Sequence, residues 1–189
     1  ATTPRYIIVA DFSFRLGNLL SLAFGDKPFI QNFIWDNTQE SRFFVVEIET
    51  GKLVAEILAD PFFAFHHINA YEDTTRGVIV VDVITYDNST TVLQSLYLKE
   101  LVCNPAPMFG TPTRFELPLP TESSNLHASP INIPGKTIVT TSLGCELPTI
   151  DYSRLNGLPY TFFYAISASS PKALFTDTLI KVNVETGQS

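Results

Sequence analysis

Two adjacent histidines, His66 and His67, are the side chains of this sequence best suited to chemistry. An aromatic run at 61–65 leads into them, and the acidic pair Glu72-Asp73 follows. A neutral imidazole in apolar surroundings is a good ligand for a transition metal. Alternatively, the pair belongs to a buried strand and bonds to backbone groups, because its spacing matches no metal-binding motif.

A β-strand at this position separates the two imidazoles. Successive side chains of a strand point to opposite faces, so His66 would share a face with Ala64 and Ile68. His67 would lie on the other face with Asn69. A metal bound at one face could therefore take only one of the two histidines, and the pattern alone does not say which.

Short strands dominate the rest of the chain and must position these residues. Runs of β-branched and aromatic residues predict strands at 5–10, 43–48, 53–58, 65–71 and 78–84. The turn at 49–52 contains glycine and predicts a hairpin. The run at 78–84 is apolar enough to be buried on both faces. Apolar spacing predicts a short helix or turn within 91–102, and the polar, Pro-rich stretch 120–135 predicts a surface connection.

An internal repeat supports a propeller. The stretch 46–52 (Val-Glu-Ile-Glu-Thr-Gly-Lys) aligns with 182–188 (Val-Asn-Val-Glu-Thr-Gly-Gln). A strand that ends in Glu-Thr-Gly and recurs several blade lengths later is typical of a β-propeller.

Two motifs resemble those of a known family. Residues 65–72 (Phe-His-His-Ile-Asn-Ala-Tyr-Glu) resemble the Phe-His-x-x-Asn-Ala-(aromatic)-Glu segment of the carotenoid cleavage oxygenases, which include the retinoid isomerase of the eye. Residues 146–151 resemble that family's Glu-(apolar)-Pro-x-Ile-Asn segment, with Asp151 where Asn is usual. Residues 3–8 resemble the segment that follows its second iron-binding histidine. The resemblance covers most of the chain and corresponds to the middle of the family's longer chain.

This resemblance implies a metal site. The family binds one ferrous iron (Fe2+) through four histidines, and its motif maps one ligand onto His66 and leaves His67 as a neighbour. The motif glutamate, which accepts a hydrogen bond from a ligand histidine, maps onto Glu146, with His66 as its expected partner. The other three iron ligands fall outside this chain. Phe65 is a candidate for the wall of the substrate tunnel or for the core.

The implied fold is all-β, roughly three to four blades of a seven-bladed β-propeller with an apolar loop segment. Residues 1–189 form one partial domain, the middle portion of that propeller. A strand that opens almost at Ala1 and a hairpin cut at Ser189 predict unpaired edges, which proteins normally cover. We therefore expect the segment to need the remaining parts of the same precursor, or complementary subunits, in order to fold and act.

The implied function is oxidative cleavage of a carotenoid or apocarotenoid double bond by iron(II) and O2. A non-catalytic carotenoid-binding protein, which holds a pigment or cargo on the same propeller, is the alternative. Isomerase chemistry of the retinoid type is a third reading. The sequence does not select the carotenoid or the bond.

The stretch 12–35 is apolar and interrupted by Gly and Pro, so it predicts an irregular segment rather than a long helix. It either folds back on the core or forms a patch at a membrane surface or lipid entrance, as in the family. The candidate patch residues are Leu19, Leu20, Leu22 and Phe24.

Composition limits the partners. The chain is 45% hydrophobic with 15 Phe, and its net charge of -7 argues against nucleic acid. Cys103 and Cys145 follow no zinc or redox spacing and predict two buried free thiols. No stretch is long enough to span a bilayer, so a cytoplasmic or membrane-peripheral location is favoured. The sequon at Asn88 keeps secretion open.

Overall fold

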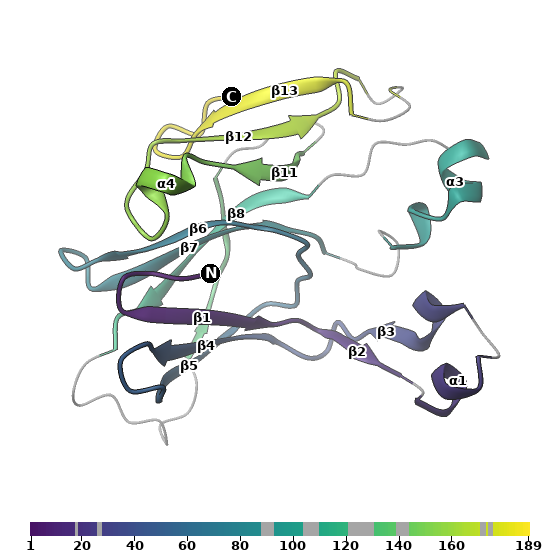
Figure 1. Ribbon diagram of the computed structural model, residues 1–189, viewed down its shortest axis with the longest axis horizontal. Helices are drawn as coiled ribbons and strands as arrows, with labels where there is room; N and C mark the ends of the chain where they lie inside the picture. The colour runs from purple at the N-terminus through teal and green to yellow at the C-terminus, as the bar shows by residue number, and fades with distance from the viewer. Residues whose placement is uncertain are drawn as a thin grey trace.

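The computed structural model describes residues 1–17, 19–25, 28–87, 93–103, 110–120, 131–138, 144–170, 173 and 176–189. Asn88 of the sequon lies outside these residues. Within the described part, three sheets are stacked one above another, and a two-stranded ribbon lies at one end, on the right in Figure 1.

The first sheet has the order β1-β4-β5-β9. Its strands are β1 (Tyr6–Asp11), β4 (Ser41–Glu47), β5 (Leu53–Ala59) and β9 (Ile131–Ile133). Strands β4 and β5 form the predicted antiparallel hairpin. Strand β9 pairs in parallel with β5, so the prediction of a surface connection throughout 120–135 was wrong at its end. Three residues are too few to show a strand pattern, yet Ile133 is buried in the core.

The middle sheet has the order β10-β8-β7-β6. Its strands are β6 (His67–Asp73), β7 (Val78–Thr85), β8 (Thr111–Pro118) and β10 (Lys136–Thr137). The third sheet has the order β11-β12-β13. Its strands are β11 (Glu146–Thr149), β12 (Phe162–Ser167) and β13 (Thr178–Asn183).

Strand β7 explains the stacking. Its alternate residues Ile79, Val81 and Val83 pack in the core shared with the first sheet, whereas Val80 and Ile84 pack in the core shared with the third sheet. All five are fully buried. The predicted burial of 78–84 on both faces is confirmed, because an apolar strand in the middle layer has no face left for water.

The two copies of the internal repeat form equivalent hydrogen-bonded turns. The Gly51 N–H donates to the Glu47 carbonyl, and the Gly187 N–H donates to the Asn183 carbonyl, each over 2.9 Å. Both glycines have positive φ, 67° and 70°, a conformation that costs other residues free energy. Equivalent turns thus follow β4 and β13.

Short elements replace the irregular segment expected at 12–35. They are β2 (Phe14–Leu16), α1 (Leu19–Phe24), the 3-10 helix η1 (Phe29–Asn32) and β3 (Phe33–Trp35). The Gly and Pro residues keep each element short. Elements this short show no period in the sequence, so the prediction of an irregular segment missed them. Two further helices are α3 (Leu98–Cys103), at the end of the predicted 91–102 stretch, and α4 (Tyr152–Leu155). No helix among the described residues has the length and apolarity to cross a membrane.

The two cysteines differ. Cys145 is buried, and burial raises the pKa of its thiol to about 12, so it is an unreactive thiol. Cys103 is exposed at the end of α3, so the prediction of two buried thiols was wrong for this residue. Residue type alone favours burial of cysteine, but a short helix at the surface leaves no core to receive it.

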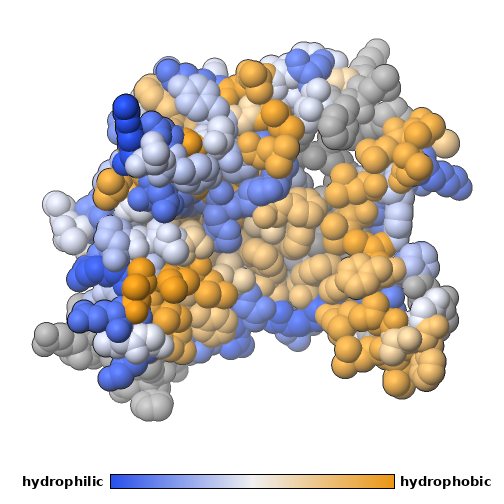
Figure 2. Space-filling model, in the orientation of Figure 1, coloured by the Kyte–Doolittle hydropathy of each residue, from blue (hydrophilic) through white to orange (hydrophobic). Residues whose placement is uncertain are grey.

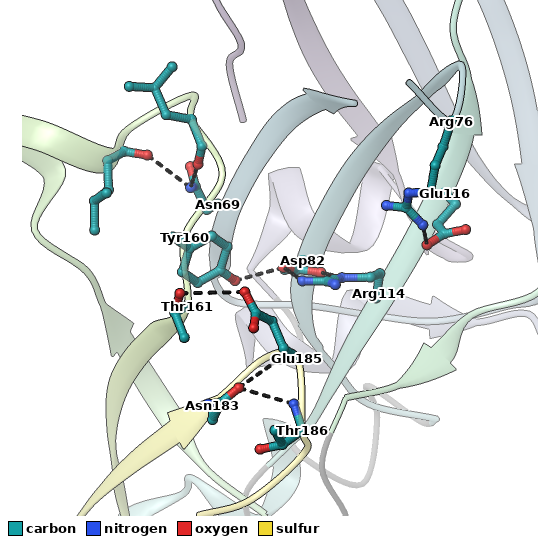
Figure 3. A network of polar contacts seen from close by, with 12 residues as sticks. Asn69, Arg76, Asp82, Arg114, Glu116, Tyr160, Thr161, Asn183, Glu185 and Thr186 are labelled. Carbon is teal, nitrogen blue, oxygen red and sulfur yellow. Dashed lines mark hydrogen bonds and ion pairs between the residues drawn. The ribbon is translucent and has the colours of Figure 1, made fainter. Parts of the chain in front are cut away.

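Figure 3 shows two ion pairs of contrasting burial on β8. Asp82 is fully buried, and Arg114 donates to its two carboxylate oxygens over 2.8 and 2.7 Å. The Arg76–Glu116 pair is 2.7 Å long, and both side chains are nearly half exposed. A buried pair leaves a strongly unfavourable charge behind when one partner is lost, whereas water replaces the partner of an exposed charge.

We predict that Asp82→Asn lowers the free energy of unfolding by about 3–5 kcal/mol, because Arg114 then lacks a counter-charge. The matched Glu116→Gln variant should lose less than about 1 kcal/mol. Urea denaturation of the intact protein measures both. Losses of equal size would contradict this difference in burial.

Candidate functional site

His66 lies one residue before β6, at the point where the chain enters the middle sheet. Phe63 and Tyr86 exchange backbone hydrogen bonds of 2.9 and 2.8 Å, and the Ile84 N–H donates to the His66 carbonyl over 3.0 Å. His66 is therefore anchored through its backbone to the end of β7. Its side chain remains 43% exposed.

A β-bulge follows immediately and corrects the expected strand geometry. The β6–β7 register shifts between His67 and Asn69. Ile68 and Tyr71 consequently pack in the same core although they are separated by an odd number of residues. The strict alternation predicted for 65–71 fails here, because a bulge inserts an extra residue on one strand.

Glu146 is the centre of the polar contacts around His66. It begins β11, and it is buried with only 8% exposure, so it is not an exposed acid at a strand end. Its Oε2 lies 2.7 Å from His66 Nδ1 and accepts the Leu147 N–H over 2.8 Å. Its Oε1 accepts the Tyr86 hydroxyl over 2.7 Å. Residues 80 positions apart in the chain therefore meet across two sheets.

The backbone supports this arrangement at a cost. Leu147 has φ of 50°, in the left-handed region that leucine rarely adopts. Such a residue costs about 1–3 kcal/mol and persists where surrounding contacts hold it. Here the Leu147 N–H donates to the carboxylate of the preceding residue, so the strained backbone helps to fix Glu146.

These contacts determine what His66 can do. A carboxylate accepts hydrogen bonds, so we assign the ring proton of His66 to Nδ1 and the free lone pair to Nε2. No group among the described residues hydrogen-bonds to Nε2. A neutral imidazole oriented by a carboxylate, with its other nitrogen unpaired, fits a transition metal. The expectation that His66 is a metal ligand is compatible with this geometry and stays a prediction.

His67 has a different environment. Among the described residues it has no hydrogen bond to Glu146, and its Nε2 is a buried nitrogen with no hydrogen-bond partner there. Burial lowers the pKa of His67 from 6.5 to about 4, so the ring is neutral near pH 7. The structure thus distinguishes two histidines that spacing could not, and only His66 is bonded to Glu146.

Aromatic side chains border the pair. Phe65 is 40% exposed, so it lies outside the core that the described residues form. Its ring packs edge-on against Phe63 and Tyr86, with centroids 4.9 and 5.6 Å away. It presents an apolar face beside His66, and its assignment to a tunnel wall stays a prediction.

Sequence reasoning assigned no role to Tyr86 or Asn69. Tyr86 follows the apolar strand β7 and carries no motif signal, although it donates one of the hydrogen bonds to Glu146. Burial and the Glu146 charge raise the pKa of Tyr86, which keeps the hydroxyl protonated and able to donate. Asn69 lies inside the quoted motif, but only the fold reveals its partners.

The apolar segment exposes much of its surface. Leu19, Leu20 and Phe24 are 69%, 68% and 82% exposed on α1, and Leu22 is partly buried. Figure 2 shows hydrophobic side chains gathered at the lower right, over the part of the molecule that α1 and the β2–β3 ribbon occupy in Figure 1. Helix α1 is therefore not folded back onto the core, whereas Phe12, Phe14 and Trp35, near the two ends of the segment, pack against it.

A single histidine does not make a metal centre. Across the described ranges, no three His, Cys, Asp or Glu side chains gather closely enough to hold a metal ion. The described residues therefore provide His66 with its bonded carboxylate and no further group of this kind beside it.

Comparison with known proteins decides the family. The family described as retinal pigment epithelial membrane protein (RPE65) matches the chain over residues 1–189. The chain belongs to this family. A carotenoid isomerooxygenase of Galleria mellonella is 31% identical over 196 residues, which cover 99% of this chain and 36% of that protein. The human mitochondrial carotenoid-cleaving dioxygenase is 31% identical over 219 residues, which cover 96% of this chain and 36% of that protein.

The chain thus spans about a third of the length of the curated relatives it matches. A solved structure of cobalt-substituted Synechocystis apocarotenoid oxygenase (ACO) superposes with a TM-score of 0.71 at 21% identity. The match covers 100% of this chain and 36% of that one. This likeness shows a mostly β fold that corresponds to about a third of the ACO structure.

We predict that Tyr86→Phe destabilises the intact protein by about 1.5–3 kcal/mol, the usual worth of a hydrogen bond to a charged group. The matched control is Tyr152→Phe, since that hydroxyl lies 3.4 Å from the Ile68 carbonyl on a residue that is 47% exposed. The control should change stability by less than about 0.5 kcal/mol. Thermal and urea unfolding report both values, and equal effects would contradict the role given to Tyr86.

Proposed function

We propose that the intact protein is a non-haem iron(II) oxygenase that cleaves a double bond of a carotenoid or apocarotenoid with O2. The observation that carries the proposal is the 2.7 Å contact between His66 Nδ1 and Glu146 Oε2, with Nε2 left without a hydrogen bond from the described residues. Membership of a family whose relatives are named as carotenoid-cleaving enzymes supports the reaction class.

In this proposal His66 holds iron through Nε2, and three histidines outside residues 1–189 complete the ligand set. Bound iron supplies the redox chemistry with O2. Glu146 fixes the imidazole plane and makes the ring a stronger ligand. Tyr86 and the Leu147 N–H hold the Glu146 carboxylate in turn. His67, neutral and not hydrogen-bonded to Glu146, is a neighbour and not a ligand.

The substrate class follows from the apolar surroundings. Phe65 presents a partly exposed ring beside His66, as a wall against a polyene would require. We place these residues in a seven-bladed propeller, with the missing blades contributed by the rest of the precursor or by complementary subunits. The alternative, a carotenoid carrier without iron, uses the same fold but needs no ligand at His66.

We predict that His66→Ala removes most of the iron from the intact protein, whereas His67→Ala leaves the iron in place. Glu146→Gln should weaken iron binding or activity by about 10–100-fold, as loss of a partner to a ligand histidine does. Metal analysis gives the iron content, and the loss of carotenoid absorbance under O2 gives the activity.

A stable bound carotenoid without iron, unchanged by His66→Ala, would favour the carrier and overturn the oxygenase. Equal iron loss in the two histidine variants would overturn the choice of His66.

We further propose that the exposed residues of α1 contact a membrane surface through which a lipophilic substrate passes. Replacement of Leu19, Leu20 and Phe24 by Ser should reduce co-sedimentation of the intact protein with liposomes, because buried apolar area drives such binding. Leu179→Ser, at an 82% exposed leucine on β13, is the control and should bind as wild type. Unchanged binding of the triple variant would exclude this contact.

A further inference from the structure

Behind the His66–Glu146 contact, a second group of buried polar contacts joins the middle and third sheets. Asn69 on β6 and Asp82 on β7 are directly opposite each other in the strand register. They are 4% and 0% exposed. Figure 3 shows both side chains directed toward the segment that precedes β12. A polar pair buried this deeply must be satisfied, and here its partners all lie across the sheet interface or on the neighbouring strand β8.

Asn69 is bonded entirely to backbone groups of the 155–158 loop. Its Nδ2 donates to the carbonyls of Leu155 and Leu158, each over 3.0 Å. Its Oδ1 accepts the Gly157 N–H over 3.1 Å. Both amide hydrogens and the amide oxygen are thus used, and the positive φ of Gly157 (79°) accompanies this loop shape. The Asn69 side chain therefore holds the 155–158 loop by three hydrogen bonds.

Asp82 holds the next part of the same segment. Its Oδ2 accepts the Tyr160 hydroxyl over 2.7 Å, while Arg114 neutralises the carboxylate from β8. Burial and the Asp82 charge raise the pKa of Tyr160, so the hydroxyl stays protonated. The loop and the start of β12 are consequently anchored to one cross-strand pair.

We propose that Asn69 and Asp82 are positioning residues, which lock the third sheet against the middle sheet so that Glu146 meets His66. The inference rests on the proposed metal site and extends it to residues that touch neither iron nor substrate. His66 and Asn69 lie three positions apart at the start of β6, and Glu146 and the 155–160 segment belong to one continuous stretch of chain. The same two pieces of chain are thus joined at two points.

Apolar packing alone does not provide this alignment. The core between the two sheets is large, but hydrophobic burial has no preferred direction. Directed hydrogen bonds to backbone groups resist a slide of one sheet over the other. A small slide would separate two atoms that are now 2.7 Å apart, beyond hydrogen-bonding distance.

The test compares two buried asparagines of the intact protein. Asn69→Asp keeps the acceptor for Gly157 but places an oxygen against the carbonyls of Leu155 and Leu158. Asn32 is the matched control, because it is 3% exposed and its Nδ2 donates to two backbone carbonyls, at 3.2 Å each, next to β3. Asn32→Asp should disturb folding in a similar way but lies outside the stacked sheets. Tyr160→Phe, which removes one hydroxyl, serves if Asn69→Asp does not fold.

Two readouts separate positioning from general stability. One is the affinity of the metal-free protein for Co2+, which we expect to fall about 10–100-fold in Asn69→Asp, by a smaller factor in Tyr160→Phe, and not in Asn32→Asp. The other is the proton–nitrogen NMR signal of His66 Nδ1–H in the metal-free protein. We expect a slowly exchanging signal in wild type and Asn32→Asp, and its loss in Asn69→Asp.

A folded Asn69→Asp or Tyr160→Phe variant with wild-type affinity and an unchanged His66 signal would overturn the proposal. Equal effects in Asn32→Asp would overturn it too. Equal Co2+ binding by wild type and His66→Ala would instead refute the metal site itself. The NMR signal, which needs no metal, would still decide whether Asn69 positions Glu146.

Discussion

The short contact between His66 and Glu146 is the interaction on which the site depends. It joins residues from the middle and third sheets, and it lets only one nitrogen of His66 face outward. A carboxylate buried to this extent is costly unless hydrogen bonds satisfy it. Tyr86, Leu147 and His66 together supply those bonds. The hydrogen bond that orients His66 is therefore also one of those that stabilise the buried Glu146 carboxylate.

The stacking of sheets makes such a contact possible. Because β7 is apolar on both faces, the first and third sheets both pack against the middle one, and the start of β6 comes to lie beside the start of β11. The bulge at His67–Asn69 then turns Ile68 and Asn69 toward the third sheet. Fold and candidate site share this origin, since the contacts of Glu146 with His66 and Tyr86 also join the two sheets.

Strand β6 organises the chain through two further polar positions. Glu72, near its end, accepts the Thr3 hydroxyl over 2.7 Å and the Arg5 Nε over 2.6 Å, which ties the segment before β1 to the middle sheet. Asn69 ties the loop before β12. Strand β6, which begins directly after His66, thus holds two distant segments of the chain.

Much of the fold could be predicted from local patterns. The hairpin β4–β5, the doubly buried β7 and the repeated Glu-Thr-Gly turn are each visible as a period or a turn residue, and all three are present. Strand β9 and the elements of 12–35 are too short to show a period. The pairing of His66 with Glu146 was predicted from the family resemblance and not from the residues themselves, because no local sequence pattern links two residues so far apart in the chain. Tyr86 and Asn69 were missed for the same reason, since their partners are set by sheet stacking.

The most direct test of this account is anomalous X-ray diffraction at the iron edge from crystals of the intact protein loaded with Fe2+ without oxygen. The account predicts an anomalous peak at coordination distance from His66 Nε2, with Nδ1 still 2.7 Å from Glu146 Oε2. A peak bound by His67, or iron-loaded crystals with no peak beside His66, would contradict it.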